Sequence, residues 1–424
     1  MTLPNADPSG HRRAIGREVA SWRKRRGLTR RQFADLCGRS ASWVDKIETG
    51  TRGLTQLPML ELVASVLHVS VETLTNDARA GGSRGAGEPA CMDAFEVASI
   101  REALQRYEAI SSVFVPVQRN EPPALDRLER SVTHAWLAFQ NAGYPSLGRS
   151  LPRLLRDTQG AVNAYGTSGD DALRARRLLS LTYQVTASAL WKLKELDLAW
   201  LAAERGLATA ELTGDSLLIS DAARRVSQGL MTLQQHEQAL TLLRADIDRL
   251  EPGRGDGSAA YLSLYGMLFL MGAVVAARAK RGATARELLA EGGGVAAQLG
   301  HDGNERYTAF GPTNVALHRV AVLADLGDGG AAVEAAQDVD PDGLARLPKE
   351  RRANFHIDSA RGYALAGRRD EAVSALLDAE TLAADEVRCR PVAAALIADL
   401  QRRPGPRSRH LTQLAARAGM PAHG

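Results

Sequence analysis

The residues of this sequence most able to do chemistry are the basic side chains near its start. Residues 1–76 hold 12 Lys and Arg against 7 Asp and Glu, whereas the rest of the chain holds 41 against 42. The positive surplus therefore lies in the first fifth of the protein. Such a distribution is expected where one small domain binds a polyanion such as nucleic acid.

The residue patterns of common enzymes are absent. The sequence contains no HExxH, GxSxG or Rossmann fingerprint, and its glycine-rich run at 253–258 lacks the GK[ST] ending of a phosphate-binding loop. Cys37, Cys91 and Cys389 have no disulfide or zinc-ligand spacing, which fits a reducing cytoplasm. We therefore expect no catalytic residue, no cofactor and no metal.

The basic segment contains a clear helix start. Thr29 and Gln32 match the S/T-x-x-E/Q capping box, in which two side chains satisfy two free backbone N–H groups. Phe33, Leu36 and Cys37 then recur at helical spacing. A short helix with one buried apolar face is predicted here.

A tight turn and a second short helix follow. Gly38 can adopt the left-handed backbone conformation that ends a helix. The second helix is predicted to start after Ser40, to bury Val44 and Ile47, and to end at Gly50. Two short helices joined by a glycine-containing turn make a helix-turn-helix.

Over about residues 13–75 the sequence resembles the Cro/repressor-like (XRE) helix-turn-helix family. The residues that match its pattern are Leu28, Thr29, Gln32, Ala34, Gly38, Ser40, Val44, Ile47, Glu48 and Gly50. The closing helices contain Leu60, Leu62, Ala64, Leu67, Val69 and Leu74. The resemblance implies an N-terminal five-helix domain that binds double-stranded DNA.

In this family the second helix enters the major groove through its N-terminal part. The resemblance implies that the residues facing DNA are Ser40, Ala41, Ser42, Trp43 and Lys46. Ser42 and Lys46 are the candidates for base contacts, because a lysine can donate to guanine O6 and N7. Phosphate contacts that set the docking register are implied for Arg30, Arg39 and Arg52.

Other roles are implied for a few nearby positions. Arg23 and Glu48 often form an internal ion pair in this family, and we expect them to brace the recognition helix. Trp43 stands where a small or polar residue is usual. It could pack on a thymine methyl group or the sugar backbone, or cover an edge of the core. Arg25 and Arg26 either contact phosphates or belong to a solvated helix face.

Composition divides the chain into four parts. Residues 81–89 (GGSRGAGEP) hold four glycines and a proline without apolar periodicity, which indicates a flexible linker. We expect a helix-turn-helix domain at residues 11–78, the linker at 79–92, a helical regulatory domain at 93–402, and a tail or short helix at 403–424.

One stretch is long and apolar enough to cross a membrane. Residues 257–277 carry no charge. Serines and glycines interrupt the stretch, and a helical pattern continues beyond Arg278. We therefore expect a buried helix of an all-helical array, with no membrane partner.

From residue 94 to about residue 402 the sequence alternates a long helix, a turn and a shorter helix. The pairs are predicted to begin near Asp171, Ser216, Ala259, Thr313 and Glu350. The last pair is the clearest, with small Ala360 and Ala364 at the helix crossing and Gly367 at the turn. The predicted fold is all-α, and the array resembles TPR-type α-solenoids.

Such an array leaves a concave groove lined by the first helix of each pair. Behind a Cro-like domain it resembles the peptide-receptor regulators of the RRNPP class and the TPR-containing regulators of actinobacteria, in which groove Asn and Arg side chains hold the ligand. Candidates here are Asn314, His318, Asn354, Asp358 and Arg361. Alternatively, Asn314 caps or turns the chain, His318 is packed, and Asp358 with Arg361 forms an ordinary surface pair.

These features predict a cytoplasmic, sequence-specific transcription regulator without enzymatic activity. We expect a homodimer that binds an inverted-repeat operator and senses a peptide or small molecule through its array. The alternative is a DNA-tethered scaffold whose array binds a protein partner. A sensor predicts a deep groove with converging Asn and Arg side chains, whereas a scaffold predicts a broad, shallow apolar face.

Overall fold

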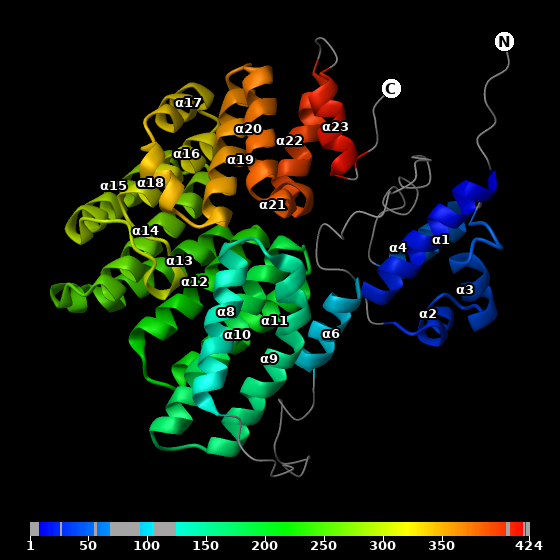
Figure 1. The fold of residues 1–424 in the computed structure, drawn as a ribbon, viewed down its shortest axis with the longest axis horizontal. Helices are drawn as coiled ribbons and strands as arrows, with labels where there is room; N and C mark the ends of the chain where they lie inside the picture. The colour runs from blue at the N-terminus through cyan, green and yellow to red at the C-terminus, as the bar shows by residue number, and fades with distance from the viewer. Residues whose placement is uncertain are drawn as a thin grey trace. The chain divides into compact units, whose positions relative to one another are not determined.

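The computed structural model describes residues 8–25, 28–54, 57–67, 94–105, 124–403, 408–418 and 420. Every regular element within these ranges is a helix, so the protein is all-α, as the sequence predicts (Figure 1). The chain groups into two compact units, one of Met1–Glu102 with Gln401–Gly424 and the other of Ala103–Leu400. The predicted linker at 79–92 lies outside the described residues.

Within the described residues the N-terminal domain consists of α1 (Pro8–Arg25), α2 (Arg30–Leu36), α3 (Ala41–Glu48) and α4 (Leu57–Leu67). The predicted capping box begins α2. The backbone N–H of Gln32 donates to Thr29 Oγ1 over 3.2 Å, and that of Thr29 donates to Gln32 Oε1 over 2.9 Å. The predicted fifth helix, near Leu74, lies outside the described residues.

Glycines allow the helices of this domain to approach closely. Gly38 has φ +61°, so it turns the chain between α2 and α3 in the left-handed conformation that the sequence predicts. A Cβ atom on Gly16 would stand 2.2 Å from the carbonyl oxygen of Ile47. Only glycine therefore lets α1 lie this close to the end of α3.

Among the described residues the core of the domain agrees with the sequence in α2 and α3, apart from Leu36. Phe33 and Val44 have no exposed surface, and Ile47 is 2% exposed. Leu36 was expected on the buried face of α2, and that prediction was wrong, because Leu36 is 58% exposed. Phe33 and Cys37 fill the inner face of this short helix, and Leu36 falls outside their arc.

The second unit is a succession of helices that pack against their neighbours (Figure 1), and residues 94–102, 401–403 and 408–418 belong to the first unit. The helices from residue 94 onward are α6 (Ala94–Gln105), α8 (Leu125–Gln140), α9 (Tyr144–Tyr165), α10 (Asp170–Lys192), α11 (Leu196–Glu211), α12 (Ser216–Thr232), α13 (His236–Leu250), η1 (Glu251–Asp256), α14 (Ala259–Arg278), α15 (Gly282–Leu299), η2 (Glu305–Tyr307), α16 (Pro312–Leu326), α17 (Gly329–Gln337), α18 (Pro341–Arg346), α19 (Lys349–Leu365), α20 (Arg369–Leu382), α21 (Ala384–Cys389), α22 (Pro391–Arg402) and α23 (Arg409–Arg417). The long helices α10, α12, α14, α16 and α19 start within one residue of the predicted positions.

The same turn joins the two helices of each pair. The residue in the left-handed conformation is Lys194 (φ +61°), Gln234 (+62°), Lys280 (+61°), Gly327 (+89°) or Gly367 (+77°). The next backbone N–H donates to the carbonyl five residues earlier, as from Glu195 to Leu190 over 3.1 Å and from Arg368 to Tyr363 over 2.8 Å. This is the Schellman motif, and its recurrence shows that the pairs repeat one structural unit.

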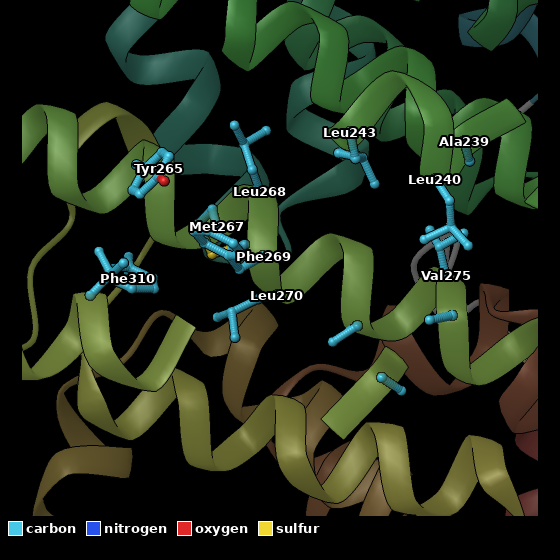
Figure 2. Close-up of a cluster of buried hydrophobic side chains, with 14 of the residues drawn as sticks. Ala239, Leu240, Leu243, Tyr265, Met267, Leu268, Phe269, Leu270, Val275 and Phe310 are labelled. Atoms are coloured by element: carbon cyan, nitrogen blue, oxygen red, sulfur yellow. The ribbon is translucent and has the colours of Figure 1, made fainter. Parts of the chain in front are cut away.

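Helix α14 is the apolar stretch that could have been a membrane span. Among the described residues it alone passes that test, with a mean hydropathy of 1.8. However, 78% of its most apolar window is buried inside the array. Leu240 and Leu243 of α13 pack in the same cluster as Met267, and so does Phe310, whose ring occupies the space left by Gly266 (Figure 2). This packing supports the predicted core helix.

Candidate functional site

Helix α3 presents two very different faces. Its buried residues are Trp43, Val44, Ile47 and Glu48. Its exposed residues are Ala41, Ser42, Asp45 and Lys46. Residues three and four apart share a helix face, so these two sets divide the helix lengthwise. The outer face can therefore enter a groove while the inner face stays packed.

Ser40 and Trp43 take structural positions at the start of α3. The Ser40 hydroxyl oxygen accepts a hydrogen bond from the backbone N–H of Trp43 over 3.2 Å, so Ser40 is the N-cap of the helix. Trp43 is 8% exposed and packs in the domain core. Of the two roles that the sequence left open for Trp43, its position matches the one at the edge of the core.

Glu48 lies at the centre of a buried charge network. The ion pair expected between Arg23 and Glu48 is present, with Arg23 Nε donating to one carboxylate oxygen and Arg23 Nη2 to the other over 3.1 Å. Arg23 also donates to the carbonyl of Leu28 over 2.7 Å. Burial raises the pKa of Glu48, but the hydrogen bonds from Arg23 and Arg30 outweigh it and leave the pKa below its usual value. The network ties α1, α2 and α3 together.

Arg30 was expected to contact a phosphate, and in the structure its side chain also belongs to this network. Its Nε donates to Glu48 Oε2 over 2.7 Å, and its Nη1 lies 3.2 Å from Asp45 Oδ1. The Arg30 side chain is still half exposed. Neither contact follows from spacing, because the partners lie on different helices. Asp45, an acidic residue on the outer face, is therefore not among the residues that the sequence pattern indicates.

The remaining DNA-contact candidates lie at the ends of α3. Arg39 precedes the helix and Arg52 follows it, and both are exposed. The backbone N–H of Arg52 donates to the carbonyl of Lys46 over 2.8 Å, which fixes the chain just beyond α3. The side chains of Arg25 and Arg26 lie outside the described residues.

The two candidates on α16 are held inside the array. Asn314 has no exposed surface, and its Nδ2 lies 3.7 Å from Met267 Sδ. His318 Nδ1 lies 2.8 Å from the carbonyl oxygen of Asn314. Burial and the nearby Arg351 lower the pKa of His318 to about 4, so its imidazole is neutral at pH 7.

The three candidates on α19 have partners within the array. Asn354 Nδ2 donates to Glu350 Oε1 over 2.7 Å. Arg361 Nη1 donates to Asp358 Oδ1 over 2.9 Å, the i,i+3 pair that the sequence left open, and Arg361 also donates to Asp325 of α16. The contact between Arg361 and Asp325 joins α19 to α16.

The array also contains a buried ionic network that no sequence pattern indicates. Lys192 Nζ lies 2.7 Å from Glu350 Oε1 and 2.5 Å from Glu386 Oε1. Tyr144 donates a hydrogen bond to Glu386, and burial, with the charge of Glu386, holds the pKa of Tyr144 well above its usual value. These residues lie far apart in the sequence, so no local pattern could have grouped them.

Metal and thiol chemistry gain no support from the described residues. No group of three or more His, Cys, Asp or Glu side chains among them could hold a metal ion. Cys37 is buried, and burial raises the pKa of its thiol to about 11. The thiol is therefore protonated at neutral pH.

Comparisons with known proteins identify the N-terminal domain. Residues 14–76 match the family described as "Helix-turn-helix domain", and no curated protein matches the chain. Among solved structures, aspartyl phosphate phosphatase F from Bacillus subtilis is 13% identical, with a TM-score of 0.42 over 90% of this chain and 96% of that one. PlcR from Bacillus thuringiensis, in complex with the peptide PapR7 and DNA, is 14% identical, with a TM-score of 0.28 over 68% and 96%. The helix-turn-helix match and the recurring turn of the helix pairs show that the chain consists of an N-terminal helix-turn-helix domain followed by an array of helical repeats.

Proposed function

We propose that this protein is a cytoplasmic, sequence-specific transcription regulator that reads double-stranded DNA with the outer face of α3. The division of α3 into a packed face and an exposed face carries the proposal, together with the helix-turn-helix match. Ser42 and Lys46 lie one helical turn apart on the exposed face. A hydroxyl and an ammonium group so placed can donate to the base edges of one major groove.

Three arginines complete the proposed interface. Arg39 and Arg52 flank α3 and would contact phosphates, which fixes the register of the helix in the groove. The half-exposed guanidinium of Arg30 also faces Asp45, so it offsets the repulsion between that carboxylate and DNA. Trp43 is assigned to the core and not to the DNA contacts.

We further propose that the array dimerises and senses a peptide or small molecule. A dimer would place two α3 helices on an inverted repeat, one for each half-site. Sensing requires two states of the array that differ in ligand affinity. The buried Arg224 and Arg225 of α12 and the buried Asn314 of α16 favour a sensor. The exposed large apolar residues of the described array, in contrast, are spread over separate helices, as Leu137, Leu173 and Leu365 illustrate.

The test is selection of bound DNA from a random pool by the full chain and by its Ser42→Ala and Lys46→Ala variants. The matched control is Lys349→Ala, which removes an exposed lysine from the array. We expect the wild type and the control to select one inverted repeat. Each α3 variant should lose about 1–3 kcal/mol of discrimination at the base that it contacts.

Two results would contradict this assignment. One is a wild-type protein that binds DNA without sequence preference. The other is a pair of α3 variants whose preference equals that of the control. Either would favour the scaffold reading, in which the array binds a protein partner and α3 does not read sequence.

A further inference from the structure

Two adjacent arginines of α12 are buried in the array. Arg224 is 1% exposed and Arg225 is 6% exposed. Arg224 Nη2 lies 2.6 Å from Asp221 Oδ1, and Arg225 Nη2 lies 3.8 Å from the same oxygen. The Arg225 guanidinium also lies over the ring of Trp136, 4.9 Å from its centroid. The Asp221 carboxylate is therefore the counter-ion of two buried guanidinium groups.

Two further arginines, on other elements, act on this group through their charges. Burial raises the pKa of Asp221, but the charges of Arg224, Arg225 and Arg306 outweigh it and keep Asp221 ionised. Burial and the charges of Arg224 and Arg351 lower the pKa of Arg225 to about 9. We call Arg224, Arg225, Arg306 and Arg351 the arginine cluster.

The neighbouring charges do not balance this cluster. Glu350 approaches Arg351 Nε at 3.6 Å, but it is also the partner of Lys192. Glu386 likewise pairs with Lys192 and lies 3.7 Å from Arg390. Lys192 and Arg390 thus offset these two carboxylates, and Asp221 is the carboxylate that Arg224 and Arg225 contact.

Several nitrogen atoms of the cluster have no acceptor. Among the described residues nothing accepts a hydrogen bond from Arg224 Nε, Arg225 Nε, or Arg306 Nε and Nη2, although all four atoms are buried. Asp221 Oδ2 likewise receives no hydrogen bond there. Burying an unpaired charge is costly, and buried polar atoms normally have partners. An anion with several oxygen atoms would supply the missing acceptors.

Arg306 also lines a cavity at a strained loop. Arg306 (φ +52°) and Tyr307 (φ +58°) adopt the left-handed backbone conformation. This conformation is strained for residues other than glycine, and such residues cluster at ligand sites. Tyr307 is fixed by a stack on Trp136 with ring centroids 5.2 Å apart. Both loop residues line a cavity of about 360 Å³, together with Arg177 and two carboxylates, those of Glu129 and Glu305.

We propose that the arginine cluster binds a small oxyanion, a phosphate or a carboxylate group, carried by a molecule that enters from the cavity beside Arg306. Arginine is suited to this role because its planar guanidinium donates two parallel hydrogen bonds to such groups. The regulatory meaning of this binding rests on the sensing function proposed above. The binding itself is independent of DNA.

The test uses the full chain and two probes, inorganic phosphate and citrate, each compared with sodium chloride at equal ionic strength. Calorimetry gives the dissociation constant, and thermal unfolding gives the Tm. We expect at least one probe to bind saturably and to raise the Tm above its value in chloride. The probe that binds distinguishes a phosphate from a carboxylate ligand.

Arg351→Gln and Arg306→Gln are the test variants, and Arg244→Gln is the matched control, because Arg244 is exposed on α13. We expect each test variant to bind the probe at least tenfold more weakly, and the control to match the wild type. Because the cluster has excess positive charge, we expect the Tm of the test variants, measured without phosphate or citrate, to equal or exceed that of the wild type.

Binding of neither probe would overturn the inference, as would equal binding by both test variants and the control. Sequence-selective DNA binding, measured on the same preparations, separates this failure from a failure of the proposed function. A protein that selects its operator but binds no anion retains the regulator and loses the oxyanion site.

Discussion

At the scale of single residues, Glu48 shows how the DNA-binding face is held. Its side chain is 3% exposed and accepts hydrogen bonds from Arg23 of α1 and Arg30 of α2. The two arginines also offset the cost of burying its charge. The carboxylate therefore fixes the orientation of α3 against two other helices, while Ser42 and Lys46 stay free to face outward.

The Glu48→Gln variant should weaken the N-terminal domain strongly. Replacing the carboxylate leaves the buried Arg23 without a counter-charge, and breaking such a pair costs about 3–5 kcal/mol. Hydrogen exchange of the α2 and α3 amides measures this loss in the full chain. Glu61→Gln is the control, because Glu61 is exposed on α4. Similar exchange in both variants would contradict the bracing role.

The same carboxylate predicts a pH dependence. The pKa of Glu48 is lower in the folded than in the unfolded chain, so the unfolded chain binds more protons between the two values. The stability that Glu48 contributes is complete above its unfolded pKa and is lost as the pH falls through its folded pKa. The Glu48→Gln variant should lack this acidic component.

At the scale of elements, glycines in α14 and α15 have opposite roles. A Cβ on Gly266 of α14 would stand 1.9 Å from the Phe310 ring, which has no exposed surface. A Cβ on Gly294 of α15 would meet nothing within 4 Å. The first glycine is required by packing, whereas the second only weakens its helix.

Two alanine substitutions should therefore shift stability in opposite directions. We expect Gly266→Ala to cost about 1–3 kcal/mol, because Phe310 must move within a packed core. Gly294→Ala should raise stability by up to about 1 kcal/mol, since alanine is the better helix former. Thermal unfolding of the two variants measures both effects. A Gly266→Ala protein as stable as the wild type would show that the Phe310 ring can move without loss of packing energy.

At the scale of the whole molecule, the proposed dimer makes a quantitative prediction about DNA. Two linked DNA-binding domains raise affinity by about 10²–10⁴-fold when both half-sites are engaged. Destroying one half-site of the selected inverted repeat should therefore weaken binding by at least about 100-fold, while sedimentation shows a dimer. A single half-site bound as tightly as the full repeat, by a monomeric protein, would contradict the dimer.

The sequence by itself determined the all-α fold, the helix-turn-helix and the starts of the repeated pairs. These features depend on local chemistry. The Thr29 and Gln32 capping box, the left-handed turn at Gly38 and the helical periodicity of buried residues act within a few positions of each other. Local signals of this kind can be recognised in the sequence without knowledge of distant contacts.

Only the tertiary structure decided which polar residues meet. Arg30 pairs with Glu48 across helices, and Trp43 packs in the core. The charges of Arg306 and Arg351 act on Asp221 and Arg225 of α12 from elements far along the chain. Asn354 and Arg361, two of the ligand candidates, have partners on other parts of the array, Arg390 and Asp325. The physical reason is that a side chain's burial and electrostatic partners depend on how whole helices pack, which no short sequence window contains.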